Sequence, residues 1–143
     1  MFKHIFIAIV AVAFTATLCL AGQSNSNITI TAAKTTPTNG KQMFTSYCAP
    51  CHGVDGRGNG PVAVALKTPP ADLTALSRNN HGKYPANHVL SVLQFGAQTP
   101  SSHGNAQMPV WGPVFGSMSQ TDPNQRTLRI SNLTRYIQTL QAQ

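Results

Sequence analysis

The sequence has few charged residues, and acidic ones are the scarcest. Charged residues make up 9% of the 143 positions, with 10 Lys and Arg against 3 Asp and Glu. The basic residues are dispersed, without the cluster of Lys, Arg and aromatic residues that forms a nucleic-acid-binding stripe. We therefore expect no nucleic-acid partner. Dispersed positive charge suits docking to a protein with an acidic surface.

Long apolar runs are also missing, apart from one near the N-terminus. Residues 5–20 are almost wholly apolar, follow Lys3 and His4, and precede small residues. A run of about 16 residues is shorter than the roughly 20 that cross a bilayer, and no basic stop-transfer cluster follows it. The pattern is typical of a secretory signal, which we assign to residues 1–21. We expect a periplasmic protein with no membrane span after cleavage.

Cysteine is scarce, with three residues in the chain. Cys19 lies in the predicted signal and would be removed with it. An alternative makes Cys19 the lipid-modified first residue of a bacterial lipoprotein, but Leu18 stands where such sites have a small residue. We expect the exported chain to keep only Cys48 and Cys51, an even pair in an oxidising compartment.

No segment alternates convincingly with the period of a strand, and there are no internal repeats, so we predict an all-α fold with long loops. Residues 22–38 are rich in Ser, Thr and Asn and carry one charge, which predicts a flexible linker. The folded domain is then expected to comprise residues 39–143.

Capping signals locate the expected helices. Asn39 and Gln42 form a capping-box-like start to a helix over about 40–50, and Pro61 begins a short one. A third helix is predicted over about 86–95, ending at Gly96.

The last helix is expected to begin at Asp122 and Pro123. It carries an apolar stripe of Ile130, Leu133, Ile137 and Leu140. Short helices with long loops make a poor core by themselves, so a large apolar cofactor is expected at the centre.

The segment Cys48-Ala-Pro-Cys51-His52 carries the chemistry. A redox dithiol of this spacing is expected near a βαβ pattern, and a structural zinc site needs four ligands; this chain shows neither pattern. Covalent attachment of haem requires two thiols, which form thioethers with the vinyl groups of the porphyrin, and a following histidine that ligates the iron. This segment contains all three residues. We predict one haem c attached to Cys48 and Cys51, with His52 as proximal ligand.

These residues resemble those of a class I monohaem cytochrome c over nearly the whole domain. Gly40 and Phe44 precede the haem motif at the offsets of that family, and Leu133 and Tyr136 resemble the pair on its terminal helix. The resemblance implies a cytochrome c fold of three to five short helices, with long Gly/Pro loops wrapped round one covalent haem.

The resemblance also implies a distal methionine, and Met108, followed by proline, matches it. A thioether sulfur is a soft ligand that raises the reduction potential. Met118 is a rival, as is one histidine among His81, His88 and His103. The resemblance further implies that the Pro61 carbonyl accepts a hydrogen bond from His52, which would fix the tautomer of that ligand.

Iron with six ligands has no open position for substrate, so we expect an electron carrier rather than an enzyme. The haem subunit of a larger oxidoreductase is the main alternative, and a ligand-binding haem sensor is a third. Because lysines are few, the redox partners are expected to present acidic or apolar docking surfaces.

Overall fold

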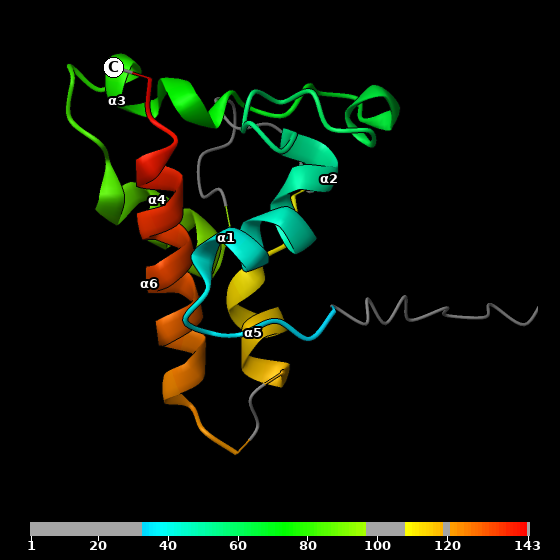
Figure 1. The fold of residues 1–143 in the computed structure, drawn as a ribbon, viewed down its shortest axis with the longest axis vertical. Coiled ribbons are helices and arrows are strands. Elements are labelled where there is room, and N and C mark those ends of the chain that lie inside the picture. The colour runs from blue at the N-terminus through cyan, green and yellow to red at the C-terminus, as the bar shows by residue number, and fades with distance from the viewer. Residues whose placement is uncertain (1–32, 97–107, 119–120, 143) are drawn as a thin grey trace, which may run out of the picture. The chain divides into compact units, whose positions relative to one another are not determined.

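A computed structural model describes residues 33–96, 108–118 and 121–142 of the chain. Within these ranges every regular element is a helix and there is no strand (Figure 1). The prediction of an all-α fold is confirmed. Among the described residues, none of the helices has the length and apolar character needed to cross a membrane.

The first helical segment consists of three elements that follow one another without a break: α1 (Gly40–Met43), the π-helical turn η1 (Phe44–Cys48) and α2 (Ala49–His52). The Asn39 side chain caps α1 by accepting from the Gln42 N–H at 2.9 Å. The Gln42 side chain in turn accepts from the Thr36 N–H at 2.9 Å. The helix predicted over 40–50 therefore begins where expected and continues to His52.

Helix α6 (Asn124–Thr139) crosses α1 closely (Figure 1). A Cβ at Gly40 would collide with the Asn132 carbonyl oxygen and lie 2.8 Å from the Tyr136 Cβ, so only glycine permits this approach. The Phe44 and Tyr136 rings lie 5.3 Å apart at the same crossing. Gly40, Phe44 and Tyr136, which carry part of the family resemblance, therefore meet at this crossing.

Helix α4 (Ala86–Phe95) packs against α6 and has the bounds that the sequence predicts, with Gly96 as C-cap at φ 82°. Helix α5 (Trp111–Ser117) packs against both α4 and α6, and it was not predicted. Its sequence contains two glycines and a proline, which lower helix propensity. One of these glycines, Gly112, has a packing role, because a Cβ there would collide with the Gln94 carbonyl of α4.

Three short elements lie between α2 and α4: the 3₁₀ turns η2 (Ala63–Ala65) and η3 (Leu73–Ala75), and helix α3 (Leu76–Asn79). The helix predicted after Pro61 is thus reduced to one 3₁₀ turn. At the start of α6, Pro123 occupies the N-cap position, and the Asp122 carboxylate before it accepts from the Asn124 N–H at 2.9 Å.

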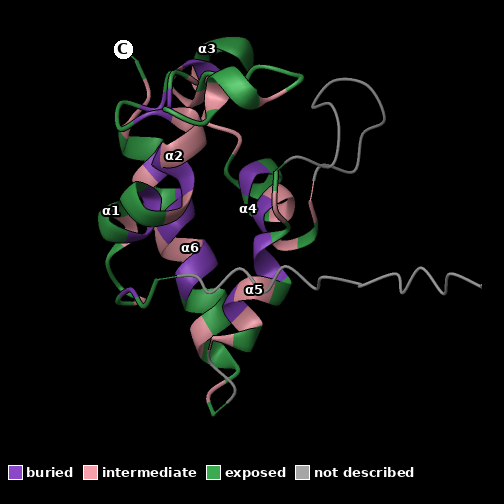
Figure 2. Ribbon diagram, turned by 90° about the vertical axis from the view of Figure 1, so that its right-hand side faces the viewer, coloured by how far each residue is buried: buried purple, intermediate pink, exposed green. Residues whose placement is uncertain are grey.

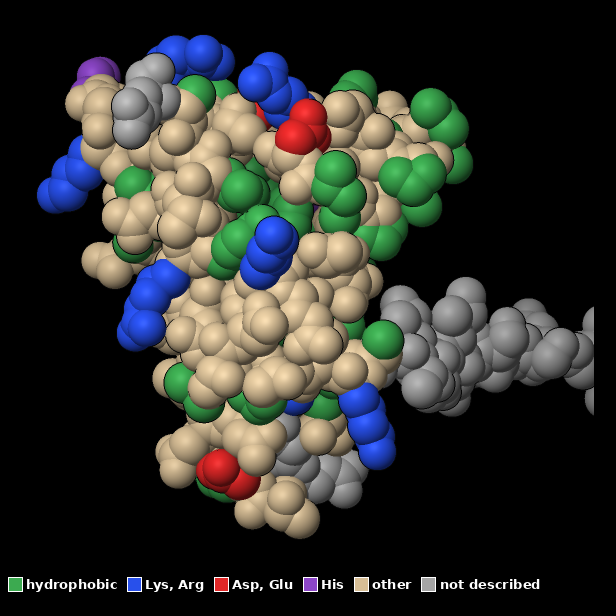
Figure 3. Space-filling view, viewed as in Figure 1, with side chains coloured by type: hydrophobic (Ala, Val, Ile, Leu, Met, Phe, Trp, Pro, Cys, Tyr) green, Lys and Arg blue, Asp and Glu red, His purple; other side chains and the backbone are tan. Residues whose placement is uncertain are grey.

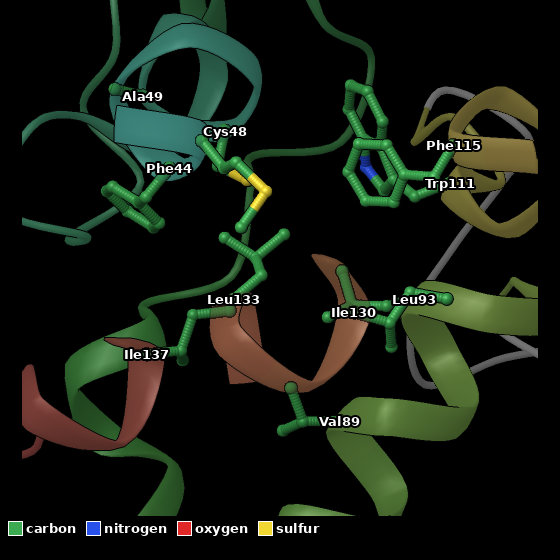
Figure 4. Packing of buried hydrophobic residues seen from close by; sticks show 11 residues of the cluster. Phe44, Cys48, Ala49, Val89, Leu93, Trp111, Phe115, Ile130, Leu133 and Ile137 are labelled. Carbon is green, nitrogen blue, oxygen red and sulfur yellow. The ribbon is translucent and has the colours of Figure 1, made fainter. Parts of the chain in front are cut away.

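The core lies between the first helical segment, α4, α5 and α6 (Figures 2 and 4). Its largest fully buried side chains are Met43, Phe44, Phe115 and Leu133. Of the predicted stripe on α6, Ile130, Leu133 and Ile137 are buried, and Leu140 is half-buried and packs against them. The stripe therefore faces the core as its spacing predicts.

The described part of the predicted linker, residues 33–38, packs on the domain. Thr35 is buried, and its carbonyl accepts from the Arg129 guanidinium at 2.8 Å. The Pro37 carbonyl accepts from the Asn132 side chain at 3.1 Å. Side chains of α6 supply the donors for these contacts, which the local composition does not reveal. The predicted signal and the rest of the linker lie outside the described residues.

Candidate functional site

An apolar cavity of about 330 Å³ opens beside the core. Cys48, Cys51 and His52 line it from the first helical segment, and Met108 lines it from the segment before α5. Aliphatic side chains make up much of the remaining wall: Leu66, Leu73, Leu76, Val89, Val92, Leu93 and Ile137. The fold thus brings the predicted cysteines, histidine and methionine to one cavity.

The two cysteines are free thiols in different surroundings. Cys48 is buried, and burial raises the pKa of its thiol to about 12, with a smaller contribution from the neighbouring Cys51. A thiol that attacks disulfides has a lowered pKa and an exposed sulfur. Cys48 instead is buried and has a raised pKa, so its surroundings disfavour a redox dithiol. Its side chain points into the space between the helices (Figure 4).

His52 ends α2 and is oriented by a backbone hydrogen bond. Its Nδ1 lies 3.0 Å from the Ala71 carbonyl oxygen. Because a carbonyl only accepts, we assign the ring proton to Nδ1, which leaves the Nε2 lone pair free to bind a metal. Burial lowers the pKa of His52, although the bond to Ala71 acts in the opposite direction. Burial thereby favours the neutral imidazole that iron ligation requires.

The predicted role of Pro61 is wrong, because Ala71 supplies the carbonyl that His52 contacts. Residues 53–62 instead turn back on α2, and the Val62 N–H donates to the Pro50 carbonyl at 2.9 Å. A carbonyl acceptor can come from any residue type, so the sequence carried no signal for Ala71.

The glycine-rich loop that follows His52 satisfies the last four carbonyls of α2. Hydrogen bonds join the N–H groups of Gly53, Val62, Gly60 and Gly58 to the carbonyls of Ala49, Pro50, Cys51 and His52, in that order, at 2.7–3.1 Å. Gly53 and Gly58 have φ near 80°, and a Cβ at Gly60 would collide with the Pro50 carbonyl. The glycines therefore let the loop contact the backbone that carries His52.

Two of the predicted candidates for the second axial ligand lie at the cavity. Met108 is 38% exposed and lines it together with Pro109, and His88 lines it from α4. Met118 and His81 are not among the lining residues that the structure describes, and His103 lies outside those residues. Among the described residues, Met108 and His88 are therefore the predicted candidates that reach the cavity, and the prediction for His103 stays open.

The cavity fits a haem group in its chemistry. Its wall is mostly apolar, as a porphyrin face requires, and the two thiols and the imidazole come from adjacent turns of one helical segment. Aromatic side chains complete one side, where the Tyr47 and Trp111 rings lie 5.3 Å apart and Phe115 stacks on Trp111 at 5.5 Å. Figure 4 shows Trp111 and Phe115 projecting from α5 toward the same space as Cys48.

Comparison with known protein families agrees with this geometry. Residues 35–94 match the family model described as "Cytochrome C oxidase, cbb3-type, subunit III". The match includes Cys48, Cys51, His52, Ala71 and all of α4 except its last residue, and it ends before Met108. No curated protein and no solved structure matches the chain significantly.

The helical fold and the family match together define a c-type cytochrome domain with an all-α cytochrome c fold. Such a domain implies covalently bound haem c and carries electrons. Its electron-transfer partners are proteins.

Proposed function

We propose that this protein is a class I monohaem cytochrome c that carries single electrons between protein partners. Cys48 and Cys51 form the thioethers, His52 is the proximal ligand and Met108 the distal one. The observation that carries this proposal is one apolar cavity lined by all four side chains, of which three come from the first helical segment and the fourth, Met108, comes from a segment far away in the sequence.

Each of these residues has a separate task. The thioethers at Cys48 and Cys51 would hold the ring against the core, and the Ala71 carbonyl holds the His52 imidazole in one orientation and tautomer. The thioether of Met108 favours the reduced state more than a second imidazole would. When bound, the haem supplies a one-electron cycle between ferric and ferrous iron. Both axial positions are then taken, which leaves none for a substrate.

The absorption spectrum of the purified holoprotein tests the proposal. The protein should be produced with a c-type maturation system, and denatured in alkaline pyridine to test for thioether-linked haem. We expect a covalent, low-spin haem with a methionine–iron charge-transfer band in the ferric state. High-spin ferric iron that readily binds carbon monoxide on reduction, or peroxide, would refute the carrier function and favour a ligand sensor.

We further propose that the protein works in the periplasm, in a respiratory or dehydrogenase-linked chain. The support is the apolar segment over residues 5–20, with its basic start and the small residues that follow. N-terminal sequencing of protein from a periplasmic extract should begin at Gly22. A protein that stays in the cytoplasm with Met1 or its basic start intact would contradict export, and acylation at Cys19 would contradict a free carrier.

The partner surface is proposed to be acidic at its rim and apolar at its centre. Met108 and Pro69 line the cavity, and Val110 beside Met108 is 40% exposed. Lys and Arg side chains are dispersed over the face shown in Figure 3.

Because the chain has so few charges, we expect the rate of electron exchange with the native partner to fall only several-fold between low and physiological salt. A much steeper fall would indicate electrostatic docking instead.

A role as the haem subunit of a larger complex is the alternative, since the matching family is described as an oxidase subunit. Purification of the native protein distinguishes the two. A free carrier should elute as a single small species at all salt concentrations, whereas a complex that survives high salt would exclude a shuttle.

A further inference from the structure

Arg129 on α6 places a positive charge inside the core. The side chain is 5% exposed, and its Nη1 and Nη2 atoms donate to the hydroxyl and the carbonyl of Thr35, both at 2.8 Å. Its Nε atom is buried without a hydrogen-bond partner. Buried arginines are normally paired with an acid, because an isolated charge loses its hydration on burial.

The acids of this chain are engaged elsewhere. The chain has 3 Asp and Glu residues in total, and all of them are aspartates within the described ranges. Asp55 pairs with Arg57 at 3.6 Å, the Asp72 carboxylate accepts from the Thr74 hydroxyl at 2.6 Å, and the Asp122 carboxylate accepts from the Asn124 N–H at 2.9 Å. Within the described residues, no carboxylate forms an ion pair with Arg129, so its charge is not neutralised there.

This charge lies directly behind the cavity wall. The Thr35 hydroxyl that accepts from Arg129 also lies 2.7 Å from the Tyr47 hydroxyl, and Tyr47 lines the cavity. On a second route, the Arg129 Cζ lies 6.0 Å from the centre of the Phe115 ring, which stacks on Trp111 of the cavity wall. The side chains of Thr35 and Tyr47 on one route, and of Phe115 and Trp111 on the other, therefore connect the charge to the cavity wall.

We infer that Arg129 is a positioning residue for the redox equilibrium: its buried charge raises the reduction potential of the haem. The inference rests on the proposed function. Reduction transfers one electron from the donor to the haem and makes the site more negative by one charge, so a nearby fixed cation stabilises the reduced form. A guanidinium stays protonated at physiological pH, and burial protects its field from salt. In a medium with an effective dielectric constant of about 20, a unit charge roughly 10 to 15 Å from any redox centre alters a one-electron equilibrium constant by on the order of tenfold.

Redox titration of the haem-loaded full-length protein tests this inference. Arg129→Met removes the charge and keeps a long stem, so the potential should fall by the equivalent of a three- to tenfold change in the reduction equilibrium constant. Arg129→Lys keeps the charge and should stay near the wild-type potential. Arg126 and Arg135 are exposed on the same helix. Arg126→Met and Arg135→Met are therefore matched controls, and at high salt they should change that constant less than twofold.

A second variant tests the inference even if Arg129→Met does not fold. Thr35→Asp places a carboxylate beside the guanidinium and should lower the potential in the same direction while Arg129 remains. If either Arg129→Met or Thr35→Asp folds, carries haem and keeps the wild-type potential, the inference is overturned. If Arg129→Met and Arg129→Lys lower the potential equally, the cause is packing and not charge, and the inference is also overturned. Wild-type protein without covalent haem would instead refute the proposed function itself, which the pyridine test detects separately.

Discussion

At the scale of single residues, His52 and Met108 reach the cavity from different surroundings. His52 is fixed at the end of α2 by the Ala71 carbonyl and by the glycine loop that covers its backbone. Met108 is 38% exposed and stands in a short segment before α5. The proximal side of the site is therefore held by more contacts than the distal side, where substitutions should be tolerated better by the fold.

We predict that Met108→Ala will lower the reduction potential and open the sixth position of the iron, because no other thioether lines the cavity among the described residues. The methionine–iron band should disappear and ferric high-spin features should appear in the absorption spectrum. Met118→Ala is the matched control and should leave the spectrum unchanged. If Met108→Ala keeps the wild-type spectrum while His88→Ala alters it, His88 is the ligand.

At the scale of elements, two glycines determine which helices can pack. Gly40 lets α1 meet α6, and Gly112 lets α5 meet α4, each by leaving room for a carbonyl oxygen of the neighbouring helix. Both crossings place helices around the cavity, since α5 carries Trp111 and the first helical segment carries the cysteines. The site thus depends on helix contacts in which glycine provides space rather than backbone freedom.

Gly40→Val should destabilise the holoprotein by about 3 kcal/mol, because the branched side chain would force α1 away from Asn132 and Tyr136. Denaturant unfolding followed by far-UV circular dichroism measures this free energy. Lys41 is exposed in the same turn, so Lys41→Val introduces the same side chain without the collision and should cost about 0.5 kcal/mol. Equal losses for the two variants would contradict the role of Gly40 at the crossing.

At the scale of the whole molecule, the core and the cavity share their walls. Cys48, Val89, Leu93, Trp111 and Ile137 belong to the buried core and also line the cavity. A haem group in the cavity would bury apolar surface on the same side chains that hold the helices together. Its loss should therefore weaken packing throughout the domain and not only at the site.

We predict that the haem-free protein with Cys48→Ala and Cys51→Ala will keep part of its helix but lose cooperative thermal unfolding, lose near-UV circular dichroism and bind a hydrophobic dye. Cys51→Ala alone retains one thioether and His52, so it should hold haem and unfold cooperatively. A double variant that unfolds as cooperatively as the holoprotein and at the same temperature would show that the core is complete without the cofactor.

The extent to which sequence predicts this structure differs between elements for physical reasons. The approximate bounds predicted for helix α4 agree with the structure, since a stop glycine at Gly96 is a local signal. Helix α5 was missed because its glycines and proline indicate a loop, and packing on α4 and α6 outweighs their low propensity. Composition predicts a linker over residues 22–38 and does not record the hydrogen bonds that Thr35 and Pro37 form with α6.

The sequence by itself determined the attachment motif at Cys48, Cys51 and His52 and the bounds of α4, because spacing and capping act between neighbours in the chain. Tertiary structure alone decided that Ala71 rather than Pro61 orients His52, that Met108 and His88 both reach the cavity, and that Arg129 is buried without an acid. These outcomes depend on backbone carbonyls and on side chains from distant segments. Any residue type can offer a carbonyl, and burial exists only after the helices have packed.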